Sequence, residues 1–310
     1  MNLLRSAILR ASQNSWLRES GTRYKFMRRT VARFMPGETA EEALAAAKEL
    51  TQGGLGTILS HLGEGVTDRA EAEGVTQHYL GVLERIREMG LPSELSVKLT
   101  QLGLDIDFDF CLKNFAKVAE RVPAERTLWI DMEQSPYVDV TLDFCRQARR
   151  RHPNVGVCVQ AYLFRTERDV EFLIAAGAPV RLVKGAYSEP PEIAFAEKAD
   201  ADENYFQLAQ ILLGAEARRA GVRAALGTHD RKLIHRVAEW AAGQGIAKSE
   251  IEFQMLYGIQ GAEQLRLARE GYRSGVFICY GSYWFPWFMR RLAERPANVA
   301  FLAKNLFSRS

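Results

Sequence analysis

Ionisable and polar side chains recur along this sequence directly after short apolar runs. Lys98, Asp131, Gln160 and Lys184 each stand at the end of such a run. One residue of this kind carries little information, but repetition is typical of a polar pocket that converges on an apolar scaffold. The polar stretches fall at 61–64, 98, 131–133, 160–162, 184–187, 228–230, 254–256 and 280–281.

Several of these residues also have a purely structural interpretation. Lys98 could be a solvated loop charge, and Asp131 could cap the helix that follows it. Arg290 and Arg291 could form a surface pair on an exposed helix. For His61 we favour a packed, hydrogen-bonded histidine over a ligand-binding one.

The run RLVKGAY at 181–187 is the most informative segment. Two cations, Arg181 and Lys184, flank the end of an apolar strand, and Gly185 permits close approach by a ligand. A lyase with a Schiff-base lysine at position 184 is one alternative, although it leaves Gln160 and the double arginine unexplained. A barrel that has lost activity and serves as a binding partner is another, although it would not need ionisable groups at nearly every strand end.

The segments that position these residues alternate between strand and helix. Strands are expected at 56–60, 95–99, 127–130, 155–161, 180–183, 224–226, 251–254 and 276–280. Helices are expected at 39–50, 68–89, 108–121, 137–151, 167–176, 192–220, 231–243, 262–271 and 284–293. Eight strand–helix rounds without a linker predict a closed (β/α)₈ barrel over 51–310, preceded by a helical arm over 1–50.

Composition and charge argue against a nucleic-acid binder, a membrane-spanning protein and a metal site. A net charge of +3 over 310 residues argues against a nucleic-acid binder. Residues 1–35 hold eight basic residues and one acid; this segment could be a packed arm, a transit peptide or a contact with an anionic membrane surface. No apolar run approaches the roughly 20 residues of a membrane span. The four cysteines lack metal-ligand spacing, so we expect no metal and a reducing, cytoplasmic setting.

Several separate motifs, in order along the chain, resemble the monofunctional bacterial proline dehydrogenases over about 55–300. They are SVKL at 96–99, DME at 131–133, QAY at 160–162, RLVKGAY at 181–187, THD at 228–230, EFQML at 252–256 and WFPWFMRRLAE at 284–294. The resemblance implies a distorted barrel with its final helix over the active site. It also implies that non-covalently bound FAD oxidises L-proline to Δ1-pyrroline-5-carboxylate, with a membrane quinone as the expected electron acceptor. The sequence has no G-x-G-x-x-G motif after a strand and no P-loop, so FAD would not bind in the Rossmann manner.

The resemblance also implies roles for individual residues. Three cations, Lys98, Arg290 and Arg291, would bind the substrate carboxylate, and Leu256 and Phe277 would form apolar walls. On electrostatic grounds we also expect Glu64 to act as a gate that pairs with Arg290 when substrate is absent, because that cation needs an anion in a pocket shielded from water. Glu64 could instead cap the next helix or lie in solvent. The expected catalytic residues are Asp131, Arg181 and Tyr187. The expected cofactor-binding residues are Met132, Gln160, Arg181, Lys184, Gly185, Ala186, Thr228, His229 and Glu294.

Two positions depart from the family pattern. Phe277 stands where the family usually has tyrosine, and Cys279 stands where it usually has proline. Because the family tyrosine packs on the substrate ring, Phe277 leaves the preference between proline and hydroxyproline open.

Overall fold

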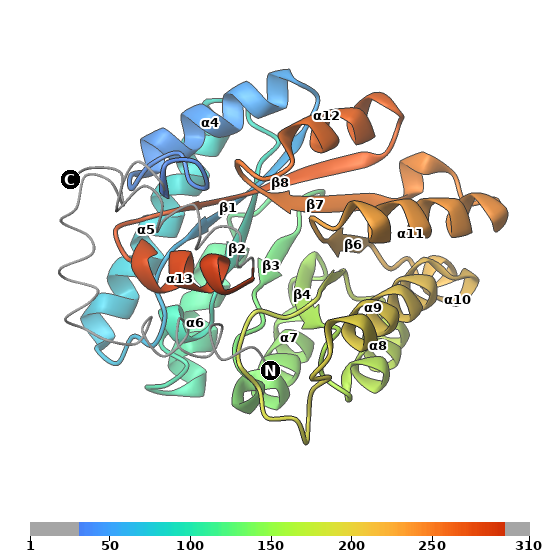
Figure 1. Ribbon diagram of the computed structural model, residues 1–310. Helices are drawn as coiled ribbons and strands as arrows, with labels where there is room; N and C mark the ends of the chain where they lie inside the picture. The colour runs from blue at the N-terminus through green and yellow to red at the C-terminus, as the bar shows by residue number, and fades with distance from the viewer. Residues whose placement is uncertain (1–30, 295–310) are drawn as a thin grey trace, which may run out of the picture.

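Eight parallel strands form a closed barrel in the computed structural model, which describes residues 31–294 (Figure 1). Each strand pairs with its sequence neighbours, and β1 pairs with β8 from Gly56↔Gly275 to His61↔Tyr280, which closes the barrel. The expected fold class is confirmed. The strands are β1 Gly56–His61, β2 Glu94–Val97, β3 Leu128–Ile130, β4 Val155–Gln160, β5 Val180–Val183, β6 Ala224–Gly227, β7 Glu252–Leu256 and β8 Arg273–Tyr280.

The strands form where apolar runs can be buried on both faces. β3 and β4 are buried along their whole length, as expected for parallel strands enclosed by helices. β8 begins at Arg273, three positions before the predicted start, because its first residues still pair with β7 and with Gly56. β2 ends at Val97 because a short 3-10 helix, η1 (Thr100–Leu102), follows almost at once.

Helices surround the barrel and follow the predicted order. Asp68, Asp107 and Asp230 cap three of them with side-chain hydrogen bonds. The helices are α4 Ala40–Gln52, α5 Arg69–Glu88, α6 Phe108–Ala119, α7 Val138–Arg149, α8 Thr166–Ala175, α9 Lys198–Leu213, α10 Ala215–Arg219, α11 Arg231–Gly243, α12 Gly261–Arg269 and α13 Trp284–Glu294, with 3-10 turns η2 Ser135–Tyr137 and η3 Lys248–Glu250.

The single helix expected over 192–220 is wrong. The backbone is extended at Gly214, which separates α9 from α10. Residues 192–197 do not join α9, and Ala194 instead forms an isolated bridge with Leu163. This bridge ties the loop after β5 to the end of β4.

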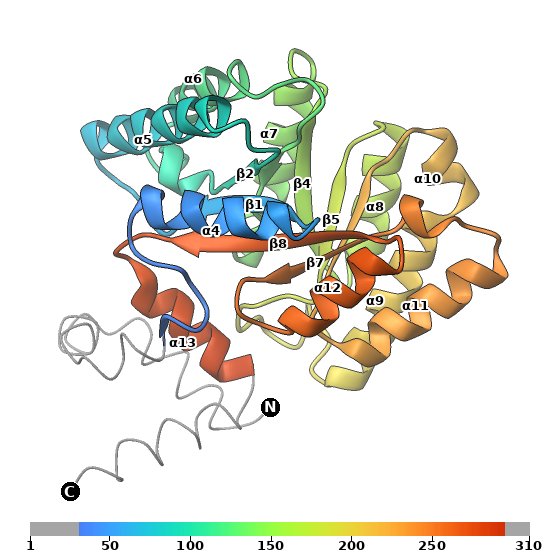
Figure 2. The same cartoon turned by 90° about the horizontal axis from the view of Figure 1, so that it is seen from above.

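The described part of the N-terminal arm packs on the barrel and on α13. Helix α4 lies along β1 and β8 (Figure 2). Val31 and Met35 are buried in a second apolar cluster with Trp284 and Phe288 of α13. The indole N–H of Trp284 also donates to the Glu38 carboxylate at 3.1 Å. The expected features of residues 1–30 lie outside the described part of the chain.

A buried charge network occupies the amino-terminal end of the barrel, opposite the pocket described below. Arg223 donates to Glu252 with two bonds of 2.9 Å and also pairs with Glu94. Glu94 accepts further bonds from the indole of Trp129 at 2.8 Å and from the amide of Thr127 at 3.0 Å. Every oxygen of the two buried carboxylates is therefore engaged.

Candidate active site

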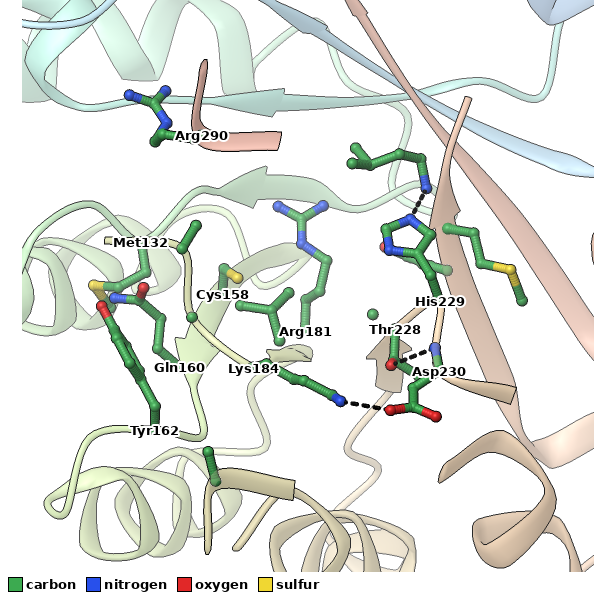
Figure 3. Close-up of a pocket in the computed structure, with 18 of the residues that line it drawn as sticks. Met132, Cys158, Gln160, Tyr162, Arg181, Lys184, Thr228, His229, Asp230 and Arg290 are labelled. Carbon is green, nitrogen blue, oxygen red and sulfur yellow. Dashed lines mark hydrogen bonds and ion pairs between the residues drawn. The ribbon is translucent and has the colours of Figure 1, made fainter. Parts of the chain in front are cut away.

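A cavity of about 1010 Å³ opens at the carboxyl ends of the strands (Figure 3). It is the position at which barrel proteins carry their active sites. Fifteen of the seventeen site residues expected from the sequence line it, namely Lys98, Asp131, Met132, Gln160, Arg181, Lys184, Gly185, Ala186, Tyr187, Thr228, His229, Leu256, Phe277, Arg290 and Arg291. The remaining two are Glu64, which contacts a lining residue, and Glu294, whose side chain lies outside the described part of the chain.

Asp131 is the centre of a buried charge cluster at the end of β3. Its carboxylate accepts from the Lys98 ammonium at 2.9 Å, from the Ser96 hydroxyl at 2.6 Å and from the Arg181 guanidinium. Burial alone would raise the pKa of Asp131, but the charges of Lys98 and Arg181 outweigh it and hold the pKa below its usual range. Asp131 does not cap the next helix, because the turn that follows begins at Gln134.

Lys98 therefore keeps its positive charge inside the barrel, where it shares its partner Asp131 with Arg181. Burial would lower the pKa of Lys98, but Asp131 and Glu64 raise it instead. The Arg181 guanidinium carbon lies 5.1 Å from the Trp129 ring centroid and 4.9 Å from that of Phe277. Arg181 is 3% exposed, and its Nη1 has no hydrogen-bond partner in the described structure. A buried donor in this state is suited to an electron-rich ligand atom.

The final helix brings a second group of cations to the same cavity. Arg290 donates to both carboxylate oxygens of Glu64, at 3.1 Å for the Nη1–Oε2 pair. The ring centroid of Tyr187 lies 5.4 Å from the Arg290 guanidinium carbon. Burial opposes the charge of Arg290, but Glu64 and Tyr187 outweigh it and raise its pKa. Arg291 lines the cavity beside it.

The other end of the cavity carries a lysine held between carboxylates. Lys184 contacts Asp202 of α9 at 2.5 Å and Asp230 at 2.9 Å, and Lys198 contacts the same two aspartates. Lys184 thus has an ionic setting, not the apolar one that the Schiff-base alternative required. Sequence analysis missed Asp202 and Lys198; their i,i+4 spacing on α9 was the only signal for the pair.

Backbone geometry shapes this end of the cavity. Gly185 has a φ of +119°, and a Cβ at this position would lie 2.2 Å from the ring of Tyr162. Only glycine fits at this position, where the backbone packs against the ring of Tyr162 and both residues line the cavity. The Thr228 hydroxyl accepts from the Asp230 amide at 3.1 Å, and His229 Nε2 accepts from the Leu256 amide at 2.9 Å (Figure 3).

His61 lies outside this lining, as a packed histidine. Its ring centroid is 4.3 Å from that of His78, and its carbonyl accepts from Gln101 at 3.2 Å. Burial, with smaller effects of His78 and Lys98, lowers the pKa of His61 to about 4. The neutral ring thus belongs to the packing behind the cavity.

All four cysteines are buried thiols without disulfides, and Cys158 and Cys279 line the cavity. Within residues 31–294, no helix combines the length and apolarity needed to cross a membrane.

Comparisons with known proteins agree with the fold and with the residues of the cavity. The family model for proline dehydrogenase matches residues 43–304. Proline dehydrogenase 2 of Bacillus subtilis (strain 168) is 38% identical over 271 residues, which cover 87% of this chain and 88% of that protein. Proline dehydrogenase 1 of the same strain is 36% identical over 310 residues, covering 99% of this chain and 100% of the relative.

A solved structure supports the fold alone. Proline utilization A from Bdellovibrio bacteriovorus, inactivated by N-propargylglycine, superimposes with a TM-score of 0.77 at 24% identity. The match covers 86% of this chain and 32% of that one. The present chain thus spans about a third of that protein.

Proposed function

From a chain that belongs to the proline dehydrogenase family and catalyses the first step of proline catabolism, we infer the reaction in more detail. We propose that this chain oxidises L-proline to Δ1-pyrroline-5-carboxylate with FAD held non-covalently in the cavity. The observation that carries the finer part of this proposal is Arg181, a buried cation with an unpartnered N–H at the centre of the cavity. A positive charge at this place would favour an anionic reduced flavin.

The cavity fits such a cofactor by size and chemistry. About 1010 Å³ is the upper end of the range for small-molecule sites, as an extended dinucleotide together with an amino acid requires. Met132 and Gln160 would lie at the flavin ring. Lys184, the backbone of Gly185 and Ala186, and the pair Thr228 and His229 would hold the ribityl and pyrophosphate groups. Lys184 forms ion pairs with Asp230 and Asp202, and in the complex with FAD it would interact with the phosphates as well as with these aspartates.

The substrate carboxylate would bind to the cations at the opposite end. Arg290 and Arg291 can present planar guanidinium groups to both oxygens, and Lys98 adds a point charge. Leu256, Phe277 and Tyr187 would form the walls around the ring methylenes. Glu294, next to Arg291 on the last helical turn, stays an expected contact of the flavin.

When bound, FAD would supply at flavin N5 a two-electron acceptor for the hydride of proline C5, and the substrate amine would give up a proton. Asp131 does not take that proton under its present contacts, because a carboxyl with a lowered pKa is a weak base. Its part is to fix the positions of Lys98 and Arg181. Tyr187 has a raised pKa because it is buried, so its phenol stays protonated. It would act as a wall and hydrogen-bond donor.

We also propose a location and an electron acceptor. The enzyme would act in the cytoplasm, with a barrel domain over 51–310 and an arm over 1–50. Electrons would pass to a membrane quinone, and the basic segment 1–35 is compatible with contact at the inner face of an anionic membrane. Sedimentation with anionic vesicles, compared with neutral ones, tests this contact.

Anaerobic addition of L-proline to the purified protein tests the central proposal. The protein should carry up to one FAD per chain, and its visible flavin bands should bleach. Trapping of a substrate on Lys184 by borohydride would favour the lyase alternative. A protein that stays colourless after reconstitution with FAD overturns the proposal.

A further inference from the structure

A buried carboxylate that the proposed mechanism does not use lies two positions after Asp131. Glu133 is 5% exposed, and its carboxylate accepts two bonds from one residue of η1. The Thr100 amide donates to Oε1 at 3.2 Å, and the Thr100 hydroxyl donates to Oε2 at 2.7 Å. The Glu133 backbone carbonyl accepts from Gln160 at 2.9 Å. Both ends of Glu133 are thus fixed.

Thr100 also forms hydrogen bonds with the loop after β1, so it links Glu133 to that loop. Its hydroxyl, which donates to Glu133, accepts from the Gly65 amide at 3.1 Å. Its carbonyl accepts from the Val66 amide at 3.1 Å. Thr100 therefore fixes the peptide between Glu64 and Gly65 by a hydrogen bond. The side chain of Glu64, on the same peptide, accepts from Arg290.

We propose that Glu133 is a positioning residue that acts through Thr100 to hold the loop of Glu64 in register with Arg290. This inference rests on the proposed function, because Arg290 is assigned there to the substrate carboxylate. An ionised carboxylate offers lone pairs on both oxygens to the two Thr100 donors, whereas protonation places a hydrogen on one oxygen and makes it a weaker acceptor of its bond from Thr100. The loop is thus held most firmly when Glu133 is charged.

The surroundings of Glu133 place this change near neutral pH. Burial raises the pKa of Glu133 to about 7, while the Thr100 bonds and the charge of Lys98 act in the opposite direction and Glu64 adds to the rise. Above this pH the loop is anchored, and below it the anchor weakens. The titratable groups that face Glu133 are Lys98, Glu64, Cys111, Tyr137 and Tyr187.

Amide hydrogen exchange tests whether Thr100 holds the loop of Glu64, and it does not require enzyme turnover. Thr100→Val removes the acceptor of the Gly65 amide and the donor to Glu133, so exchange in the peptide covering 62–66 should become several-fold faster. Thr100→Ser keeps the hydroxyl and should restore slow exchange. Ser135→Ala is a matched control, because Ser135 donates its amide and hydroxyl to Glu189 in the same pattern but, among the described residues, has no hydrogen bond to the loop.

Binding of tetrahydrofuran-2-carboxylate tests the consequence for the site. This probe has the ring and carboxylate of proline but no amine to titrate. In the wild type, its Kd should rise several-fold from pH 6 to pH 8, because the anchored Glu64 competes better for Arg290. Glu133→Gln should abolish this rise and keep the tighter, low-pH Kd throughout, and Thr100→Val should do the same.

The two proposals fail in different ways. If the wild type is not bleached by proline, the proposed function fails. If the wild type is bleached but Glu133→Gln, correctly folded by circular dichroism, keeps the pH dependence of Kd, the positioning role fails. Unchanged exchange of the loop in Thr100→Val overturns it independently.

Discussion

The carboxylate of Glu64 and the guanidinium of Arg290 meet through two hydrogen bonds, although 226 positions separate them in sequence. Glu64 belongs to the loop after the first strand, and Arg290 belongs to the helix after the last. The ion pair expected between them is present. It compensates the charge of a cation that is only 12% exposed.

Glu64→Ala should remove the carboxylate that competes with the substrate carboxylate for Arg290. We expect several-fold tighter binding of a proline analogue, together with a several-fold change in the rate of flavin reduction and little loss of FAD. Stopped-flow reduction and ligand titration measure these two effects. Glu84→Ala, which removes an exposed ion pair with Arg87, is the control. If both quantities stay unchanged, Glu64 is not a gate.

Lys98→Ala should severely impair proline oxidation. Loss of the ammonium removes one of the two cations that hold Asp131 and, under the proposed function, a charge-assisted contact with the substrate carboxylate. We expect a loss of about 2–4 kcal/mol in transition-state binding, which is roughly a 30- to 1000-fold fall in kcat/KM. Arg291→Ala should behave similarly, whereas the exposed Lys113→Ala should not. Normal kcat/KM in a folded Lys98→Ala protein removes Lys98 from the site.

Phe277→Tyr should change the discrimination between proline and trans-4-hydroxyproline. Phe277 lines the cavity beside Arg181, so an added hydroxyl brings a polar group to the substrate ring and takes up space. The ratio of kcat/KM for the two substrates should shift several-fold. Phe164→Tyr, at a ring that is 49% exposed, should leave the ratio constant. An unshifted ratio in Phe277→Tyr means that this side chain does not face the substrate.

Arg223→Ala should lower stability far more than the loss of a comparable surface pair. The substitution leaves the buried carboxylates of Glu94 and Glu252 without their shared cation. Glu252 would keep only a longer contact with Arg273, at 3.7 Å, and breaking a buried pair in this way costs about 3–5 kcal/mol. Chemical denaturation measures it. Arg236→Ala also removes a bidentate contact to a glutamate, but at the surface, and should unfold almost as the wild type does. Equal effects of the two substitutions would contradict the role given to the network.

His61 should make the protein sensitive to mild acid. Its folded pKa, about 4, is depressed from the ordinary value of about 6.5, so the unfolded chain binds the proton more readily. The free energy of unfolding should therefore decrease as pH falls from 6.5 towards 4. In His61→Gln this decrease with pH should be smaller than in the wild type. Thermal unfolding across this range measures the slope. The exposed His235→Gln should keep the wild-type slope.

Periodicity and turn residues were sufficient to predict the barrel. All eight strands were located, because parallel strands buried on both faces are short, apolar and bounded by polar residues. The boundaries were less exact. The extra residues of β8 are recognisable only from pairing with β1 and β7, which join distant parts of the chain. The helix break at Gly214 was overlooked because both flanking segments favour helix.

The site was predictable where polar residues follow strands, and less so where partners come from elsewhere. Asp131 and Lys184 stand at such positions, directly after β3 and β5, whereas Arg181 lies inside β5 and was found through the family resemblance. Thr100 and Glu133 were not linked, since their hydrogen bonds cross 33 positions and neither residue is unusual alone. The contacts of Arg223 were also missed, because no local pattern relates it to Glu94.

The pairing of β1 with β8 has a consequence for synthesis of the protein. As the ribosome releases the chain, β1 emerges early but gains its second neighbour only after Tyr280 has been made. Throughout that interval the growing sheet has two open edges of apolar strands, which are prone to pair with other chains. Closure of the barrel is thus late and depends on contacts between distant residues, a topology that folds slowly. These edges would have to be kept from other chains until β8 has been made, and the arginines of α13 that line the cavity are synthesised only after it.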